Sequence, residues 1–160
     1  MTLLERHDKN SVAHLRMNAP EKLNALSEAM LAALQNEFDS LAQDDSIRAV
    51  ILSGAGKAFC AGHYLKEMTA GRQSEDGGKA YFKSPFDTCA KMMSSIQKLP
   101  QPVIAKVHGI ATAAGCQLVS SCDLAVAEDG ARFGVNGVNI GLFCSTPMVA
   151  LSRNIPRKKA

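Results

Sequence analysis

The chain has 160 residues, of which 46% are hydrophobic and 21% are charged. This length predicts one domain with a substantial core, and the composition excludes a disordered chain. The 18 basic and 15 acidic side chains give a formal net charge of +3. That balance is too slight to predict nucleic acid or an anionic membrane as the main partner. No apolar run reaches the roughly 18 residues that a membrane-spanning helix needs.

The first ten residues carry four charged side chains and no apolar segment. They predict neither a secretory signal nor a retained transit peptide. We therefore expect a cytoplasmic protein, with the mitochondrial matrix as the alternative if a transit peptide has been removed. The histidines show no metal-ligand spacing, so no metal site is expected. Five cysteines without a Cys-x-x-Cys pair are interpreted as reduced, packed thiols: Cys60, Cys89, Cys116, Cys122 and Cys144.

The first third of the chain predicts a strand, a helix and a second strand. Apolar and polar residues alternate over Val12–Met17, which indicates a half-buried strand. Ser27 is a candidate N-cap for an amphipathic helix over residues 28–43. The β-rich segment 47–52 then leads into a glycine turn.

The remainder continues this alternation. The polar, glycine-containing segment 70–79 is predicted to be a mobile surface loop. Apolar spacing predicts a helix over residues 81–99, with Pro85 marking a helix start nearby rather than a kink. Later expected elements are strands over residues 103–107 and 123–127, a buried helix over 113–122, and a last helix starting near Pro147. Strands alternating with helices, without an internal sequence repeat, predict an α/β fold.

Two glycine-bearing turns that follow predicted strands are the candidates for chemistry. The first covers residues 57–67 (KAFCAGHYLKE) and the second residues 108–118 (HGIATAAGCQL). Small residues allow a ligand to approach the backbone, and N–H groups at a helix entry suit an anion. Two such donors from separate strands would form an oxyanion hole. The alternative is two ordinary tight turns that pack a helix closely on a strand.

The two turns resemble the two signatures of the crotonase, or enoyl-CoA hydratase/isomerase, family. Residues 59–62 (FCAG) match the first signature and residues 109–123 the second. Further matches follow in the same order: NALS at 24–27, AVILSG at 49–54 and KLPQPVIA at 98–105. Residues 141–147 (GLFCSTP) resemble the enoyl-CoA hydratase domain-containing branch of the family. Together the resemblance covers residues 12 to 150.

The resemblance implies a crotonase-like spiral of ββα units, as a single N-terminal core domain over residues 1–160. The family's C-terminal helical part is expected to be missing, so the resemblance implies a C-terminally truncated fold. The implied substrate is a coenzyme A thioester, with no permanently bound cofactor. The implied assembly is a homo-oligomer, a trimer or dimer of trimers in the full-length family, with no nucleic acid or membrane partner.

The resemblance also assigns residues. The backbone N–H groups of His63 and Ala114 correspond to the family's oxyanion hole. Lys57 and Lys66 are candidates for contact with CoA phosphates, with a plain surface role as the alternative. The residues expected around the substrate are Ala25, Ala61, Gly62, Tyr64, Leu65, Lys66 and Gly115.

The sequence departs from the family where proton chemistry is needed. The family's two catalytic glutamates correspond to Gln117 and Gly137. An amide cannot take a proton from water at neutral pH, and glycine has no side chain. Loss of one positioned acid or base typically costs about 10²–10⁴-fold in rate. We therefore expect a lyase- or isomerase-type enzyme that stabilises a thioester enolate but hydrates poorly. The alternative is a non-catalytic acyl-CoA-binding or interaction module.

Other side chains near the expected pocket offer polar groups, although packing is the favoured interpretation for each. Asp123 is expected to be structural and to bond the backbone. The side chains that could offer a polar group to the substrate are the His63 imidazole, Tyr64 in place of the family's common aspartate, Cys116, Cys144, Asn136 and Asn139.

Overall fold

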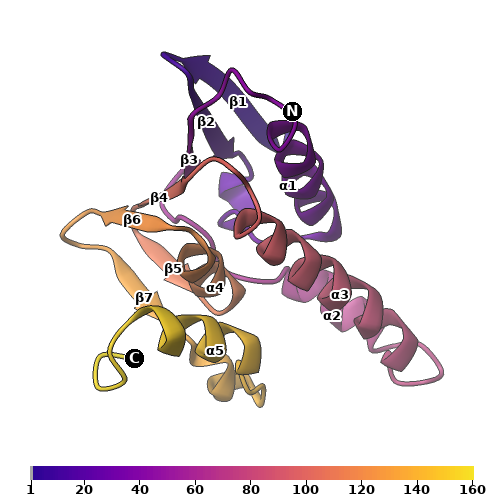
Figure 1. Ribbon diagram of the computed structural model, residues 1–160. Helices are drawn as coiled ribbons and strands as arrows, with labels where there is room; N and C mark the ends of the chain where they lie inside the picture. Colours follow the sequence, from indigo (N-terminus) through magenta and orange to yellow (C-terminus); the bar gives the residue numbers. More distant parts are fainter. Residues whose placement is uncertain (1) are drawn as a thin grey trace.

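The computed structural model describes residues 2–160. Its main sheet has five strands in the order β1-β2-β3-β4-β6, and a smaller sheet pairs β5 with β7 (Figure 1). β1 and β2 form an antiparallel hairpin, whereas the other neighbouring strands are parallel. The strands are β1 (Leu4–Lys9), β2 (Val12–Met17), β3 (Ala49–Gly54), β4 (Val103–Val107), β5 (Ile110–Thr112), β6 (Leu124–Ala127) and β7 (Arg132–Gly134).

Helices follow the strands and pack against one another in a row. α1 packs on α3, α3 on α4, and α4 on α5, from the indigo N-terminal part to the yellow C-terminal part of Figure 1. None of the helices in residues 2–160 has the length and apolar content to cross a membrane. The helices are α1 (Glu28–Leu41), α2 (Leu65–Gly71), α3 (Lys79–Ile96), α4 (Ala114–Ser121) and α5 (Ser145–Asn154), with 3-10 turns η1 (Pro20–Lys22) and η2 (Asn136–Ile140).

A strand, a short extended segment and a helix recur along the chain. Single bridges join Leu26 to His63 and Cys60 to Ala111, and they continue the layer formed by β5 and β7. Each of β2, β3, β4 and β6 is therefore followed by a segment of this second layer and then by a helix. The predicted spiral of ββα units is confirmed, although no sequence repeat accompanies it.

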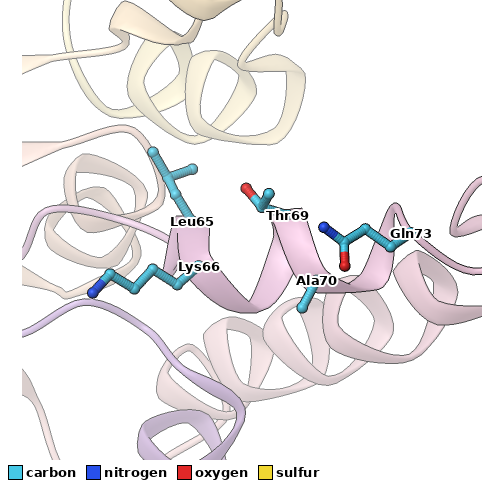
Figure 2. A pocket seen from close by; sticks show the side chains of 5 residues that line it. All are labelled: Leu65, Lys66, Thr69, Ala70 and Gln73. Carbon is cyan, nitrogen blue, oxygen red and sulfur yellow. The ribbon is translucent and has the colours of Figure 1, made fainter.

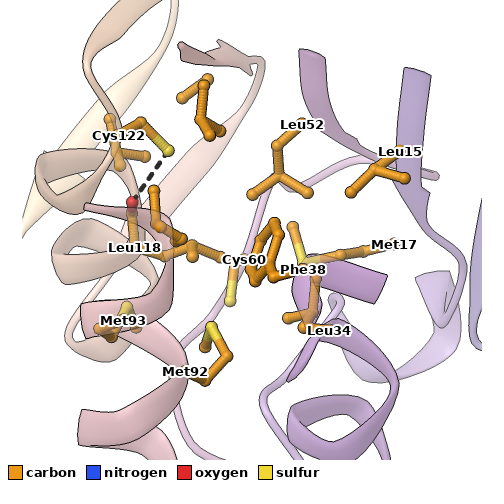
Figure 3. Close-up of a cluster of buried hydrophobic side chains, with 14 of the residues drawn as sticks. Leu15, Met17, Leu34, Phe38, Leu52, Cys60, Met92, Met93, Leu118 and Cys122 are labelled. Atoms are coloured by element: carbon orange, nitrogen blue, oxygen red, sulfur yellow. Dashed lines mark hydrogen bonds between the residues drawn. The ribbon is translucent and has the colours of Figure 1, made fainter. Parts of the chain in front are cut away.

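The core lies between the main sheet and α1, α3 and α4 (Figure 3). Leu15 and Leu52 from the sheet, Phe38 from α1 and Met92 from α3 are all at most 1% exposed. Burying such side chains stabilises the fold by about 1.5–3 kcal/mol each. Cysteines take part in this packing: Cys122 Sγ donates to the Leu118 carbonyl at 3.3 Å. All five cysteines are free thiols and four are buried, as predicted.

Ser27 caps α1 as predicted. Its side chain accepts a hydrogen bond from the Met30 N–H, and the apolar face of the helix is buried against the sheet. The predicted strands 47–52, 103–107 and 123–127 and the predicted helices 28–43, 81–99 and 113–122 all exist, with ends that differ by at most three residues.

Pro85 is the clearest error of the sequence prediction. It does not mark a helix start, because α3 begins at Lys79 and continues through it to Ile96. A proline inside a helix leaves the carbonyl four residues earlier, here that of Tyr81, without its helical hydrogen bond. Burial of the following turns offsets that loss, since Cys89, Met92, Met93 and Ile96 all face the core.

The segment 70–79 is also more structured than predicted. The unpredicted helix α2 extends into it as far as Gly71. A turn centred on Asp76 follows, in which the carboxylate accepts hydrogen bonds from the Gly78 N–H, the Ala80 N–H and the Ser74 hydroxyl. These donors, chiefly the Ala80 N–H, hold the pKa of Asp76 below its ordinary value.

The two outer strands of the main sheet differ in chemistry. β1 carries charged residues, and its Arg6 forms ion pairs with Asp8, with Glu37 of α1 and with Asp44. β6, at the opposite side, has the sequence LAVA and is exposed along its length, with Leu124 61% and Val126 63% exposed.

Candidate functional site

A cavity of about 570 Å³ lies where the two glycine-bearing turns meet. The first turn contributes Ala61 and His63, and the second contributes Ala114 at the start of α4. α3 supplies Phe86, and residues between 136 and 147 line the rest. The cavity therefore draws its walls from four segments that are distant in the sequence.

Backbone pairing fixes the two turns against each other. The Cys60 N–H donates to the Ile110 carbonyl at 3.1 Å, and the Thr112 N–H donates to the Cys60 carbonyl at 3.0 Å. Gly115 lies so close that a Cβ there would be 2.2 Å from the Cys60 carbonyl oxygen. At Gly62, whose φ is +87°, a Cβ would lie 3.2 Å from the Ala114 nitrogen. The glycines thus permit a contact between the turns that larger residues would block.

Two backbone donors border the cavity without a protein acceptor. At the first turn, Leu26 pairs with the residues on either side of His63 and leaves the His63 N–H out of the pairing. At the second, Ala113 has the strained values φ +50° and ψ −123°, and its N–H bonds the Gly134 carbonyl. The next N–H, that of Ala114, opens α4. Within residues 2–160, neither the His63 nor the Ala114 N–H donates to the protein.

The His63 side chain also lines the cavity. Its ring meets Phe86 edge to face, with the ring centroids 5.4 Å apart. Burial lowers the pKa of the imidazole below its ordinary value, while the Leu26 backbone opposes that shift. The ring is therefore neutral at neutral pH, and its apolar contact with Phe86 suits that state.

Gln117 and Gly137, which the resemblance assigns to the family's two glutamate positions, both line the cavity. Gln117 is only 9% exposed, and its Oε1 accepts a hydrogen bond from Thr146 Oγ1 at 3.0 Å. A Cβ at Gly137 would lie 2.6 Å from Cys144 Sγ and 2.8 Å from the Leu142 carbonyl oxygen. Among residues 2–160, no aspartate or glutamate lines the cavity. Its polar side chains are amides, hydroxyls, the thiols of Cys89 and Cys144, and one imidazole.

Sequence reasoning missed the three hydroxyls of this wall, those of Thr112, Ser145 and Thr146. Thr112 Oγ1 lies 3.2 Å from the Gly134 carbonyl oxygen and 2.5 Å from Asn136 Oδ1. Thr146 bonds Gln117 across 29 positions of sequence. The only signal for Thr146 is its place in the Ser-Thr-Pro start of α5. Of the predicted polar candidates, Asn136, Asn139 and Cys144 line the cavity, whereas Cys116 is buried beside it.

Several residues predicted to surround the substrate lie outside the cavity wall. Ala25 is buried, and Gly115 packs behind the wall on Cys60. The Tyr64 ring is covered by Lys22, whose Nζ is 5.1 Å from the ring centroid. Ala61 and Leu65 do line it, and Gly62 lies at the contact between the turns.

Lys57 and Lys66 are both exposed and do not line the cavity. Lys66 belongs to a shallow hollow of about 350 Å³ along α2 (Figure 2). In that view Leu65 and Lys66 leave the helix in different directions, and Leu65 lines both the hollow and the cavity, so the two adjoin at the start of α2. No group of three or more metal-ligating side chains exists in residues 2–160.

Asp123 is structural, as expected. Its Oδ2 accepts a hydrogen bond from the Val103 N–H at 2.7 Å, and its own N–H donates to the Val103 carbonyl at 2.9 Å. The two bonds join the start of β6 to the start of β4.

The sequence was compared with known protein families and proteins. The model of the enoyl-CoA hydratase/isomerase family matches residues 7–160. The chain belongs to this family. It is 49% identical over 160 residues to enoyl-CoA hydratase domain-containing protein 3, mitochondrial, of Xenopus laevis, covering 100% of this chain and 52% of that protein. The human protein of the same name is 48% identical over 94% of this chain and 48% of its own length.

Solved structures of this family share the fold. An enoyl-CoA hydratase of Mycobacterium smegmatis superposes with a TM-score of 0.92 at 57% identity, covering 99% of this chain and 60% of that one. Human enoyl-CoA hydratase domain-containing protein 3 gives a TM-score of 0.90 at 44% identity, with 99% and 60% covered. The predicted crotonase fold and the predicted resemblance to the domain-containing branch are confirmed. The chain spans about half the length of the curated relatives that it matches.

Proposed function

We propose that the chain binds an acyl-CoA thioester and stabilises its enolate through the backbone N–H groups of His63 and Ala114. The observation that carries the proposal is the meeting of two unpaired backbone donors at one cavity. When a thioester loses its α-proton, negative charge develops on the carbonyl oxygen, and prepositioned donors stabilise it. One such donor typically contributes about 2.7–4 kcal/mol.

Local structure supports this role for the two N–H groups. Gly62 allows the first turn to approach the Ala114 nitrogen, and the strained backbone at Ala113 directs the start of α4. Strain of this kind persists only where the surrounding structure holds it, and it concentrates at functional sites. The first-turn N–H groups of a helix also carry partial positive charge, which favours a developing oxyanion.

Hydration of an enoyl thioester is not the activity that we propose. It requires a group that takes a proton from water and one that delivers a proton to carbon. Gln117 cannot ionise, and Gly137 has no side chain. Enolate chemistry of the isomerase or lyase kind needs the oxyanion donors and a base that takes the α-proton; on the cavity wall, the neutral imidazole of His63 can accept it.

The test combines binding with proton exchange. Calorimetry with butyryl-CoA should show saturable binding, and NMR in deuterated water should show exchange of the α-protons. Hydration of crotonyl-CoA should stay far below the rate of an efficient hydratase. Gly62→Ala should weaken binding, because its Cβ would lie 3.0 Å from the Thr112 carbonyl oxygen and 3.2 Å from the Ala114 nitrogen. Absence of binding, or rapid hydration, would refute the proposal.

The second candidate is a non-catalytic acyl-CoA-binding or interaction module. The lack of a carboxylate on the cavity wall within residues 2–160 favours it. Binding of butyryl-CoA without α-proton exchange would identify this module.

Compartment and assembly stay predictions. The sequence predicts a cytoplasmic protein with the mitochondrial matrix as the alternative, and the Xenopus and human relatives are named mitochondrial, which supports the alternative. Self-association is predicted from the family, and light scattering after size-exclusion chromatography tests it. The coenzyme A thioester is proposed as substrate rather than as a resident cofactor.

A further inference from the structure

Two histidines face each other across the hairpin of β1 and β2. His7 and His14 are directly opposite in the antiparallel register, although they are seven positions apart in the sequence. Both are exposed, and their ring centroids lie 6.5 Å apart with an interplanar angle of 42°. Spacing along the chain does not reveal this pair, because the rings meet only after the chain turns back at Asn10 and Ser11.

The geometry allows both rings to bind one metal ion. Directly opposite residues of an antiparallel pair have Cβ atoms about 4.5–5.5 Å apart and project from the same face of the sheet. A metal about 2.0–2.1 Å from one nitrogen of each ring puts the two centroids roughly 5–6 Å apart. The observed 6.5 Å is slightly longer. Exposed side chains change rotamer rapidly, so a small rotation of His7 and His14 completes the chelate.

The two rings are not engaged elsewhere. Within residues 2–160, neither takes part in a hydrogen bond or an ion pair, whereas the His108 ring bonds the Gly56 carbonyl at 2.9 Å. On the same face of the hairpin, Glu5 pairs with Arg16 at 3.5 Å, so its charge is balanced. Lys9 also projects there, but it is exposed, and its long side chain can hold the ammonium in solvent. Two imidazole nitrogens are therefore available on this face.

We propose that His7 and His14 form a surface site for a divalent transition-metal ion such as Zn²⁺, Ni²⁺ or Cu²⁺. Imidazole suits these ions, whereas Mg²⁺ and Ca²⁺ take oxygen ligands. No third His, Cys, Asp or Glu joins the pair within residues 2–160, so water fills the remaining coordination positions. The bound ion ties β1 to β2 and stabilises the folded hairpin, since chelation needs the register of the folded state. The site shares no residue with the cavity, so the inference does not depend on the proposed function.

Titration with a metal salt tests the site. Calorimetry of the 160-residue chain, without an affinity tag, should show one Ni²⁺ bound per chain and no binding of Mg²⁺. His7→Gln and His14→Gln should each weaken the affinity for Ni²⁺ by about tenfold or more, because the second imidazole acts as an intramolecular ligand. His108→Gln is the matched control and should leave the affinity unchanged, since that ring lies outside the hairpin. All proteins carry Cys144→Ser, which removes the partly exposed thiol as a competing ligand.

Thermal unfolding gives a second readout. Ni²⁺ at about a hundredfold excess over its dissociation constant should raise the melting temperature of the parent chain by roughly 5–10 °C. The shift should fall to near zero in both hairpin variants, because a single histidine binds the ion equally in the folded and unfolded chain. Absence of saturable Ni²⁺ binding, or an affinity retained in a folded His7→Gln or His14→Gln variant, would overturn the site. Circular dichroism establishes folding, and since both positions are exposed, either variant alone decides the test.

Discussion

Asn24 should be among the most important side chains for stability. It is fully buried, and its amide links three backbone groups. Its Oδ1 accepts from the Ala19 N–H at 3.0 Å, and its Nδ2 donates to the carbonyls of Ala55 and Ala58 at 2.8 Å each. The two bonds from Nδ2 hold the turn that leads from β3 to the cavity.

Asn24→Ala leaves these three buried groups unpaired, at a cost of at least about 1 kcal/mol each. Asn24 also has φ +51°, where alanine costs roughly 1 kcal/mol more. We therefore expect the free energy of unfolding to fall by about 4 kcal/mol, and the melting temperature to fall by roughly 8–16 °C for a chain of this size. Urea denaturation followed by circular dichroism measures the first quantity and a thermal scan the second.

Asn36→Ala is the matched control, because Asn36 is exposed on α1. This substitution should change the free energy of unfolding by no more than about 0.7 kcal/mol. Asn24→Asp should also destabilise the protein, since a carboxylate oxygen would then face the Ala55 and Ala58 carbonyls. A loss below about 1 kcal/mol for Asn24→Ala would refute the reasoning, because it would mean that water or rearranged backbone satisfies all three groups.

Three further predictions concern the cavity. The pKa of His63 is lowered in the folded state by burial, so the unfolded chain binds more protons and stability falls as pH drops through the ordinary histidine pKa of about 6.5; urea denaturation between pH 5 and 7 should show this slope, and His63→Phe should reduce it. Burial raises the pKa of Cys60 and Cys122 to about 12 and of Cys89 to about 11, so a thiol reagent at pH 8 should label Cys144 first, and Cys144→Ser should remove the fast phase. Gly137→Glu should lower stability by about 1–3 kcal/mol in thermal unfolding, because a Cβ there meets the Leu142 carbonyl at 2.8 Å; an unchanged melting temperature would show that the turn has room for a side chain.

Local patterns determined which elements could be predicted. The alternation in β2 and the cap and spacing of α1 are properties of neighbouring residues, and both were predicted correctly. β1 was missed because charged residues dominate it. Its clearest signal is the two-residue turn at Asn10 and Ser11, which have φ +53° and +59° and join it to β2. α2 was missed because it is short and buries none of its residues.

The site was predictable only in part, for a related reason. Resemblance to the family assigned His63 and Ala114, but no sequence rule shows that their N–H groups stay unpaired, since that depends on how Leu26 and Gly134 bond their neighbours. The contact of Thr146 with Gln117 joins α5 to α4, so it follows from the packing of two helices. Pro85 shows the same limit, because the burial of α3 outweighs a local preference.

The two edge strands of the main sheet, β1 and β6, differ in how readily a further strand could pair with them. At β1, the guanidinium of Arg6 and its three carboxylates place charge where a further strand would have to lose water, which discourages addition. β6 carries only apolar side chains, so pairing with it would remove no water from charged groups. Any strand that extends this sheet, whether from the same molecule or another, would therefore pair with β6, beside Leu124 and Val126. Replacing either residue with lysine would disfavour that pairing.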